Sequence, residues 1–205
     1  MAAAHGLIED NMDKTLSLTG QFLIAMPGMG DQRFEKSVIF VCAHSEDGAM
    51  GFIINQSMMS PDIGEFFTKL EIITDEEQDT VSEELALRSL NMGGPVEPGR
   101  GFVLHTPDYE SETSLKIGDN VCLTATLEIL RAIAMGRGPE QILLVLGYSG
   151  WGAGQLESEI ISNGWLNCEA DRDILFDQNH ETKYERALAI LGVDPLLLSS
   201  ESGHA

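Results

Sequence analysis

The stretch from residue 147 to residue 155 reads Gly-Tyr-Ser-Gly-Trp-Gly-Ala-Gly-Gln and is the first place to look for chemistry. It follows an apolar run and precedes a segment with helical character, so its backbone amides could bind an anion at a helix start. The known phosphate-binding patterns are absent, however. No Gly-Lys-Ser/Thr triplet closes the stretch, and Glu157 stands where a dinucleotide fingerprint has its third glycine. A second glycine-rich segment, beginning at Gly28, fails likewise because Arg33 takes that position.

The stretch also nearly matches the nucleophile elbow of serine hydrolases, Gly-x-Ser-x-Gly. Gly147 and Ser149 fit, whereas Trp151 replaces the final glycine, which must be small because the turn is sharp. An acid followed by His180 lies downstream of Ser149, which is the chain order of hydrolase triads. The candidate acids are Asp171, Asp173 and Asp177. Acids are so numerous here that this order arises easily by chance, and hydrolase chemistry at Ser149 stays an alternative.

Metal-binding patterns are weak throughout the sequence. His44 and His105 stand at the ends of predicted strands, and neither belongs to a closely spaced histidine or cysteine pair. Residues 171–176 begin like a calcium loop but place apolar residues where a ligand and a glycine are required. Glu157 and Glu159 diverge by about 200° on a helix, so they are poor partners for one metal. We therefore expect no metal, no cofactor and no catalytic residue that can be named.

The charge balance excludes two classes of partner. The 205 residues include 33 acids and 12 Lys or Arg, for a net charge of −21. The excess is even, with 17 acids and 6 bases in residues 1–102 and 16 and 6 in residues 103–205. Direct binding to nucleic acid or to an anionic membrane needs basic side chains that this chain does not gather. At 43% hydrophobic residues, the chain can still bury a core and is not a disordered acidic tail.

Several features favour a cytoplasmic location. The first residues lack the basic segment and long apolar run of a secretory signal. The apolar run 142–146 is far shorter than the roughly 18–20 residues that span a bilayer. Cys42, Cys122 and Cys168 are far apart and odd in number, which favours buried thiols in a reducing compartment.

The elements that would position these residues are a mixture of hairpins and helices. Strands are predicted over residues 20–25, 36–43, 51–55, 85–92, 101–106, 121–124 and 142–146, from β-branched and apolar runs bounded by turn residues. Helices are predicted over 61–70, with Ser60 as its cap, and over 127–134, 155–161 and 182–191. Hairpins come first, and helices stand between and after them. This order predicts an α+β fold with a mixed, mostly antiparallel sheet.

One domain accounts for most of the chain. No Pro/Ser-rich linker interrupts it, so we expect a single domain over residues 18–198, an N-terminal tail over 1–17 and a C-terminal tail over 199–205. Residues 71–84 hold seven acids and no base. We interpret this segment as a solvated loop, with a functional acidic patch as the alternative.

The ordered motifs of this chain resemble those of the AlgH/YqgE family of bacterial proteins. His44 matches the family pattern. The other matching pieces are residues 20–27 (GQFLIAMP), 34–40 (FEKSVIF), 48–55 (GAMGFIIN), 93–96 (GGPV), 101–105 (GFVLH), 146–160 (LGYSGWGAGQLESEI), 163–166 (NGWL) and 174–177 (ILFD). The resemblance implies a single α+β domain with a strand-rich, barrel-like core and several flanking helices, in a cytoplasmic protein. Members often carry the label of transcriptional regulator, and the family supplies no agreed catalytic residue.

The leading functional hypothesis is a non-enzymatic binding or regulatory protein that acts through a protein or a small molecule. Turns that carry Gly, Pro, His and Tyr at strand ends are where sites usually form. The candidate surface comprises Pro27, Gly28, Asn55, Gly93, Gly94, Pro95, His105, Tyr148, Ser149, Trp151, Gln155 and Glu157. For the glycines, the competing explanation is that they only permit tight turns and positive φ. Any effect on transcription is expected to be indirect, because the charge disfavours DNA.

Overall fold

Side chains that alternate between two buried faces form the first strands of the fold. The computed structural model describes residues 17–74, 81–194 and 198. In it, β1 (Gln21–Ala25) directs Phe22 and Ile24 into one apolar cluster, and Leu23 and Ala25 into another. A strand covered on both faces has no exposed apolar side to alternate with a polar one, which explains its continuous apolar run.

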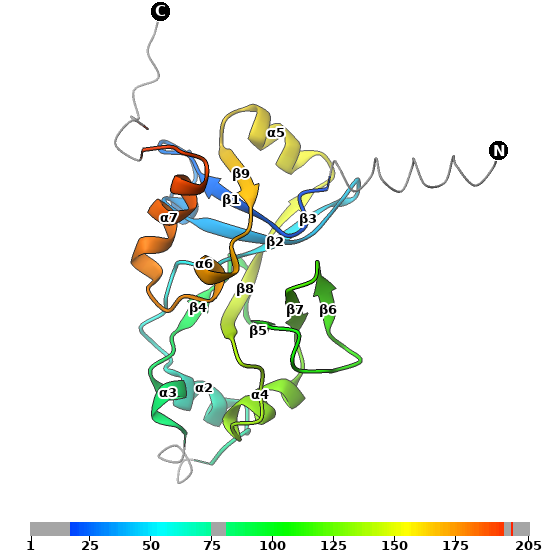
Figure 1. The fold of residues 1–205 in the computed structure, drawn as a ribbon, viewed down its shortest axis with the longest axis vertical. Coiled ribbons are helices and arrows are strands. Elements are labelled where there is room, and N and C mark those ends of the chain that lie inside the picture. Colours follow the sequence, from blue (N-terminus) through cyan, green and yellow to red (C-terminus); the bar gives the residue numbers. More distant parts are fainter. Residues whose placement is uncertain (1–16, 75–80, 195–197, 199–205) are drawn as a thin grey trace, which may run out of the picture.

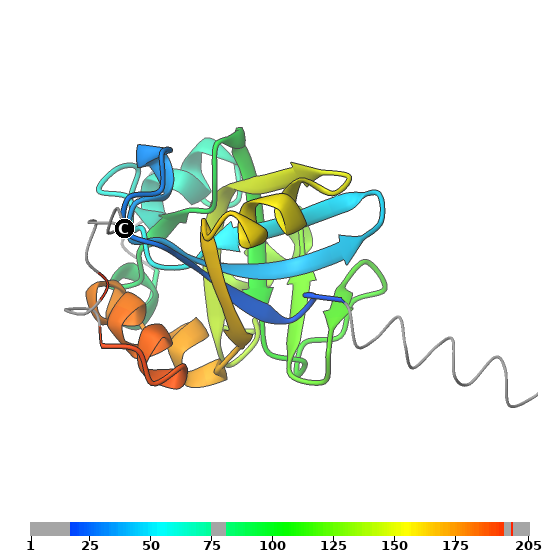
Figure 2. The same cartoon turned by 90° about the horizontal axis from the view of Figure 1, so that it is seen from above.

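The described residues form one curled sheet of nine strands, with the order β6-β7-β5-β8-β3-β2-β1-β9 and β4 placed beside β8. All neighbours are antiparallel except β4 and β8, which run parallel. After β1, the strands are β2 (Val38–Ser45), β3 (Gly48–Ile53), β4 (Leu90–Met92), β5 (Val96–His105), β6 (Leu115–Ile117), β7 (Val121–Thr124), β8 (Ile142–Gly152) and β9 (Trp165–Glu169). The sheet curls into a half-barrel, seen from above in Figure 2. The predicted α+β, mostly antiparallel and barrel-like fold is confirmed.

Helices cover the sheet in three groups (Figure 1). The α-helices of the described ranges are α2 (Ile63–Lys69), α3 (Glu83–Ala86), α4 (Leu127–Ala134), α5 (Gln155–Ile161), α6 (Arg172–Phe176) and α7 (Lys183–Ile190). Two short 3-10 turns, η1 (Gln32–Phe34) and η3 (His180–Thr182), precede β2 and α7. Helices α2, α3 and α4 share one apolar cluster with β4, β5 and β8, whereas α6 and α7 pack with β1 and β2. Helix α5 packs on β8 and β9.

Two predictions near the acidic segment are wrong. The predicted strand over 85–92 is a helix in its first half, because α3 covers Glu83–Ala86 and β4 begins only at Leu90. The Ser82 side chain accepts from the Leu85 N–H and caps α3, so the predicted loop over 71–84 also ends early. Residues 75–80 of that segment lie outside the described residues.

The start of α2 also differs from the prediction. Asp62, rather than Ser60, is the N-cap, and its side chain accepts from the Glu65 N–H at 2.8 Å. Glu65 accepts in return from the Asp62 N–H at 3.3 Å, which completes a capping box. The cap with a partner three residues on therefore determines where the helix begins.

The largest correction concerns the glycine-rich stretch, which is not a turn. Strand β8 continues to Gly152, because residues 149–152 pair with β3, and only Ala153 and Gly154 separate it from α5. Strands β6 and β9 were not predicted. Strand β5 begins earlier than expected, at Val96, across an irregularity between Val96 and Gly101.

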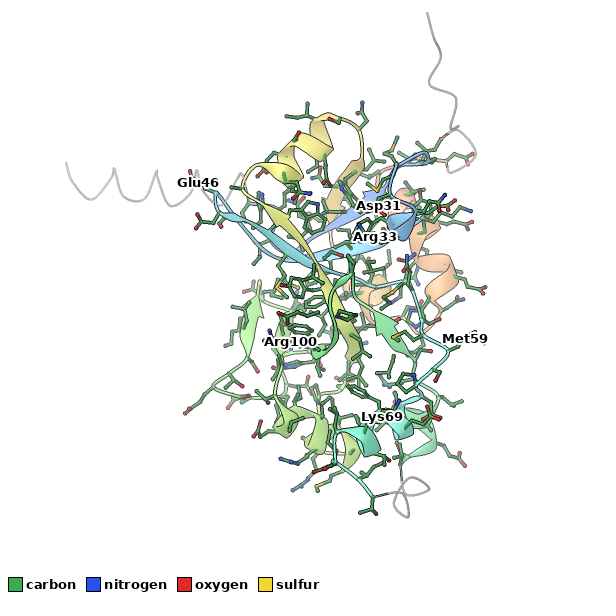
Figure 3. All side chains as sticks on the ribbon, turned by 180° about the vertical axis from the view of Figure 1, so that it is seen from behind. Asp31, Arg33, Glu46, Met59, Lys69 and Arg100 are labelled. Carbon is green, nitrogen blue, oxygen red and sulfur yellow. The ribbon has the colours of Figure 1, made fainter. Side chains whose placement is uncertain are left out.

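The remaining boundaries agree with the predictions to within a few residues. Of the predicted tails, residues 1–16 and 199–205 lie outside the described residues, and Ser17 hydrogen-bonds Thr19 at 3.0 Å. Among the helices that the structure describes, none has the length and apolar character needed to cross a membrane. Glu46 marks the far tip of the β2–β3 hairpin in Figure 3.

Candidate functional site

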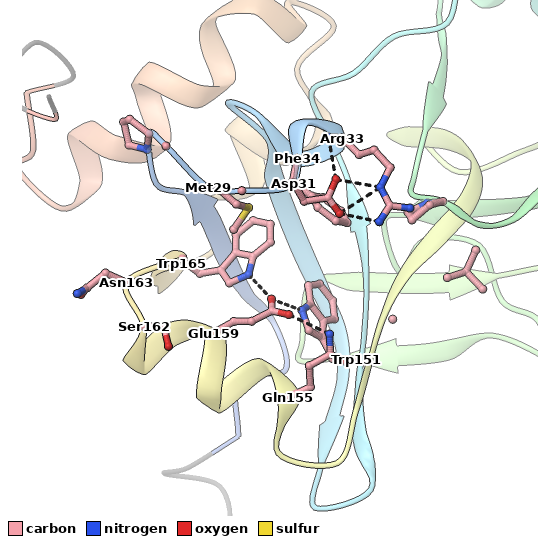
Figure 4. A pocket seen from close by; sticks show the side chains of 17 residues that line it. Met29, Asp31, Arg33, Phe34, Trp151, Gln155, Glu159, Ser162, Asn163 and Trp165 are labelled. Carbon is pink, nitrogen blue, oxygen red and sulfur yellow. Dashed lines mark hydrogen bonds and ion pairs between the residues drawn. The ribbon is translucent and has the colours of Figure 1, made fainter. Parts of the chain in front are cut away.

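A cavity of about 640 Å³ lies between the loop after β1, the end of β8, helix α5 and the start of β9 (Figure 4). Five residues of the predicted surface line it, namely Pro27, Gly28, Pro95, Trp151 and Gln155. They come from three regions of the sequence that the curled sheet brings to one end of β8. A cavity of this size is in the range that holds small ligands or short peptide segments.

Glu159 organises the wall of this cavity. Its Oε2 accepts from the indole Nε1 of Trp151 at 2.9 Å and from that of Trp165 at 2.8 Å, and its Oε1 accepts from the Gln155 amide at 2.9 Å. The two indole rings meet edge to face at 6.0 Å, and Phe34 meets Trp165 at 5.6 Å. Figure 4 shows the carboxylate between the two tryptophans. One charged group thus satisfies three donors and aligns an aromatic wall.

The sequence explains why these side chains converge. Gly154 adopts φ +70°, a left-handed conformation, and lets the chain turn directly from β8 into α5. The Gln155 Oε1 accepts from the Gly152 N–H at 3.0 Å and ties the helix start to the strand end. Gln155 and Glu159 are four residues apart and share one helix face. On the opposite rim, Arg33 pairs with Asp31 at 2.6 Å.

Asn55 lies at a different cavity, of about 750 Å³, which it shares with Pro27, Gly28 and Tyr184. Its side chain is already occupied. The Asn55 Oδ1 accepts from the Val38 N–H at 2.8 Å, and its Nδ2 donates to the Lys36 carbonyl at 2.8 Å. Asn55 therefore clamps the start of β2, where Lys36 adopts φ +52°.

His105 lies apart from both cavities. It is fully buried at the end of β5, with Nε2 2.9 Å from Thr124 Oγ1 and Nδ1 2.7 Å from the Thr106 carbonyl. Burial lowers the pKa of His105 and favours the neutral ring. The prediction that His105 belongs to one surface with Trp151 and Gln155 is therefore not supported by the geometry, since both ring nitrogens are satisfied inside the fold.

Gly93 and Gly94 carry the chain across β8. Strand β4 lies on one side of β8 and β5 on the other, so the link between them must cross it. A Cβ on Gly94 would sit 2.2 Å from the Tyr148 carbonyl carbon, and one on Gly93 would sit 2.4 Å from the Gly147 oxygen. Gly147 itself adopts φ +69°. These glycines permit a close crossing of two chain segments, which is the structural explanation that the sequence left open.

The crossing also fixes Tyr148 and Ser149. The Tyr148 ring packs edge to face on Phe102 at 6.1 Å. The Ser149 side chain is only 1% exposed, and its Oγ donates to the Gly93 carbonyl at 3.3 Å. Among the hydrogen bonds of the described residues, none joins Ser149 to a histidine. The geometry therefore gives no support to Ser149 as a nucleophile.

The other members of the suggested triad have separate roles. His180 directs Nδ1 to the Ile54 carbonyl at 3.3 Å, and burial lowers its pKa. Asp171 caps α6, which spans most of the calcium-like pattern of residues 171–176, and Asp177 pairs with Arg186. Within the ranges that the structure describes, no three His, Cys, Asp or Glu side chains form a group that could hold a metal ion.

Glu157 faces away from the aromatic wall and bonds His44. The His44 Nδ1 accepts from the Leu18 N–H at 3.1 Å, so its Nε2 carries the proton and donates to Glu157 at 2.7 Å. The Glu157 backbone N–H and then His44 lower the pKa of the Glu157 carboxyl. This pair anchors α5 to the β2–β3 hairpin.

Sequence reasoning missed several residues of the cavity wall. Trp165 and Phe34 lie outside the predicted surface, and Glu159 stands at the end of the predicted stretch from Tyr148 without a role of its own. The available signal was that two acceptors at i and i+4 stand between the only two tryptophans of the chain. A buried indole N–H needs a partner, and of the two acids between the tryptophans Glu159 is the one that shares a helix face with Gln155.

The fold and this cavity define a single-domain α+β protein with a half-barrel sheet and an aromatic-walled pocket at one strand end. The model of the AlgH-like family matches residues 22–196, and the chain belongs to this family. It is 53% identical over 190 residues to a UPF0301 protein of Sinorhizobium medicae, which covers 92% of this chain and 93% of the relative. It is 50% identical to UPF0301 protein mlr7511 of Mesorhizobium japonicum, and the match covers 100% of this chain and 96% of that relative.

Solved structures agree with the fold. The solution structure of AlgH from Pseudomonas aeruginosa matches with a TM-score of 0.75 at 39% identity, covering 93% of this chain and 97% of that one. Protein DIP2367 from Corynebacterium diphtheriae matches with a TM-score of 0.63 at 18% identity, covering 91% and 94%, and shows the fold alone. The predicted family is thus confirmed.

Proposed function

We propose that this protein is a non-enzymatic binding protein and that the cavity beside Glu159 holds its ligand. The single observation that carries this proposal is the convergence of five predicted surface residues, Trp151 among them, with the second tryptophan, Trp165, on one cavity of about 640 Å³. An apolar wall with a few fixed polar groups is the usual composition of a ligand site. The Glu159 network fixes this wall, so little ordering is needed when a ligand binds.

The regulatory part of the proposal follows from charge. A molecule of net charge −21 lacks the basic groove that a DNA backbone needs, so any effect on transcription passes through a protein or a small molecule. A mobility-shift titration with random-sequence duplex DNA tests this. We expect no shift at sub-micromolar protein and physiological salt, and a salt-dependent shift under those conditions would contradict the indirect route.

NMR tests the binding site directly, because both tryptophans of the chain stand in the cavity wall. The two indole N–H signals are followed while a set of bacterial metabolites and short peptides is titrated. We expect at least one compound to shift both signals. Ser162, the C-cap of α5, lines the cavity, whereas Ser158 within α5 does not line it. Ser162→Phe should therefore lower the affinity for that compound tenfold or more, and Ser158→Phe should leave this affinity unchanged.

Two results would overturn the proposal. In the first, no compound of the set moves either indole signal. In the second, compounds bind equally well to the wild type and to Ser162→Phe, which would place their site elsewhere. Each variant is first compared with the wild type by its thermal midpoint, so that a loss of fold is not mistaken for a loss of binding.

A further inference from the structure

The end of β8 has a strand partner on one side only. Strand β3 pairs with β8 from Ser149 to Gly152. On the opposite side, β5 reaches no further than Val96, which stands across from Tyr148. Beyond Tyr148, no strand of the described chain pairs with this side of β8. The 640 Å³ cavity opens there, and Gly150, Pro95 and Val96 all line it.

The backbone of Gly150 points toward this open side. The N–H and C=O groups of successive strand residues face alternate edges. The Trp151 carbonyl faces β3, since a Cβ on Gly48 would meet that oxygen at 2.3 Å. The Gly152 N–H faces the other way and donates to Gln155. Gly150 alternates with Trp151, so its N–H and C=O face the cavity, where an unpaired strand edge is a template for another strand.

The surroundings suit an extended chain. Gly150 is exposed, so another backbone can reach its edge. Val96 is 37% exposed, and with Pro95 it forms an apolar rim that could receive a side chain of an added strand. Backbone pairing with side-chain pockets beside it is how sheets bind peptide segments.

Charge selects the kind of segment. Of the charged residues that line the cavity, Arg33 is paired with Asp31, which leaves the negative charge of Glu159 uncompensated by a base. The whole molecule carries −21 and attracts cations over its surface. We infer that the open edge of β8 binds an extended, positively charged peptide segment of a partner protein, which adds as a strand beside Gly150. This inference rests on the proposed function and names the partner class for the same cavity.

The test uses a fluorescein-labelled heptapeptide of alternating lysine and valine, with its glutamate–valine counterpart as the charge control. Binding to the full-length protein is measured by fluorescence polarisation. We expect the lysine peptide to bind at least tenfold more tightly than the glutamate peptide. A dimer that forms on this edge, shown by sizing at several concentrations, would instead assign the edge to a second copy and overturn the inference.

Matched variants separate strand addition from general charge attraction. Gly150→Pro removes the N–H that faces the cavity and keeps the groups that pair with β3. Gly150→Ala keeps the N–H, and its Cβ meets only the Tyr148 ring at 3.4 Å. We expect Gly150→Pro to lower the affinity for the lysine peptide at least tenfold. Gly150→Ala should change this affinity less than twofold. Equal binding to both variants would mean that the peptide is held by charge alone, and the inference would be wrong.

Backbone-methylated peptides test the same point without altering the protein. An added strand uses every second N–H of its backbone. Methylation of the three valine nitrogens, or of the two central lysine nitrogens, should therefore have unequal effects. We expect one peptide to lose at least tenfold in affinity and the other to stay within threefold. Equal losses, or none, would overturn strand addition even if Gly150→Pro does not fold.

The outcomes also separate this inference from the proposed function. If metabolites shift the indole signals and Ser162→Phe blocks them, while no peptide binds, the cavity is a small-molecule site and only the strand inference fails. If neither metabolites nor peptides reach the cavity, both proposals fail together.

Discussion

The carboxylate of Glu159 joins two tryptophans that come from different strands. Trp151 belongs to β8 and Trp165 to β9, and each donates its indole N–H to the same oxygen. The alignment of the cavity wall therefore depends on one side chain of α5. A buried donor that loses its acceptor keeps the full cost of its desolvation.

Replacing Glu159 should consequently be more costly than replacing its neighbour Glu157. We expect Glu159→Ala to lower the free energy of unfolding by about 2–4 kcal/mol, because two indole donors lose a charged acceptor. Glu157→Ala removes the same charge from the same helix but breaks only a partly exposed pair with His44. We expect a loss of about 1 kcal/mol or less. Chemical denaturation measures both, and similar losses would show that the indole network contributes little.

Lys183 is the other residue whose environment controls a measurable property. It is fully buried, and its Nζ donates to the carbonyls of Leu175 at 2.9 Å and Ile54 at 3.0 Å. Burial lowers its pKa from 10.5 to about 7. Above pH 7 the folded chain has therefore released a proton that the unfolded chain still holds up to about pH 10.5.

The contribution of Lys183 to stability should rise with pH. Between pH 7 and 10 the unfolded state binds more protons, so the free energy of unfolding increases by up to about 1.4 kcal/mol per pH unit. Below pH 7 both states are protonated and the contribution stays at its minimum. The difference in unfolding free energy between the wild type and Lys183→Met, measured at pH 6, 8 and 9.5, should show this slope. Lys116→Met, on the exposed part of β6, is the control, and a flat difference for Lys183 would contradict its lowered pKa.

At the scale of residues, the sequence indicated which types matter but not which way they face. Pro27, Pro95, Trp151 and Gln155 reach one cavity, whereas Asn55 and His105 end in hydrogen bonds within the fold. Strand ends look alike in sequence, and the curl of the sheet decides which of them meet. Whether a polar group is satisfied inside is a three-dimensional property that spacing does not encode.

At the scale of elements, the crossing of the β4–β5 link over β8 makes the strongest demand on the chain. Gly94 adopts φ +153°, and a Cβ there would sit within 2.4 Å of three backbone atoms of Tyr148 and Ser149. We expect Gly94→Ala to cost about 3 kcal/mol or more, since the atoms it meets are backbone and cannot give way. Gly99→Ala, where a Cβ would meet nothing within 4 Å, should stay within about 0.5 kcal/mol. Thermal midpoints of the two variants decide the matter, and equal midpoints would speak against a tight crossing.

Helix α2 offers a test of where an element begins. Asp62 closes the capping box with Glu65, and Ser60 is exposed outside the helix. We expect Asp62→Ala to cost about 1 kcal/mol because a first-turn N–H loses its acceptor. Ser60→Ala should cost little. If urea denaturation gave the larger loss for Ser60, the predicted cap would be right after all.

Elements were predictable where a strong apolar period or a clear cap marks them. The hairpin of β2 and β3, helix α4 and helix α5 agree with expectation because propensity and tertiary context favour the same state. The end of β8 was missed because glycines normally indicate turns. There, the close crossing excludes a side chain at Gly147, and pairing with β3 holds Gly150 and Gly152 in the strand although a Cβ would fit at both. Tertiary contacts thus override the local preference. Strand β9 was missed because its register comes from β1, which is remote in sequence.

At the scale of the whole molecule, the charge of −21 opposes compaction. Raising ionic strength from 10 mM to 100 mM shortens the screening length from about 30 Å to about 10 Å. We therefore expect the thermal midpoint to rise by several degrees across this range. Potassium and tetramethylammonium chloride should act alike if screening is the cause. A midpoint that depends on the cation, or does not rise, would show that repulsion is not a significant term.

The placement of β8 has a consequence for synthesis of the chain. This central strand comes from residues 142–152, yet it lies between β4 and β5 and beside β3, all of which are made earlier. On the ribosome, strands from about the first two thirds of the chain therefore keep unpaired edges until residue 152 emerges. The nascent chain is exposed to wrong pairing during that interval. Completion of β8 thus closes the edges of β3, β4 and β5, and only β9, α6 and α7 remain to be added to the fold.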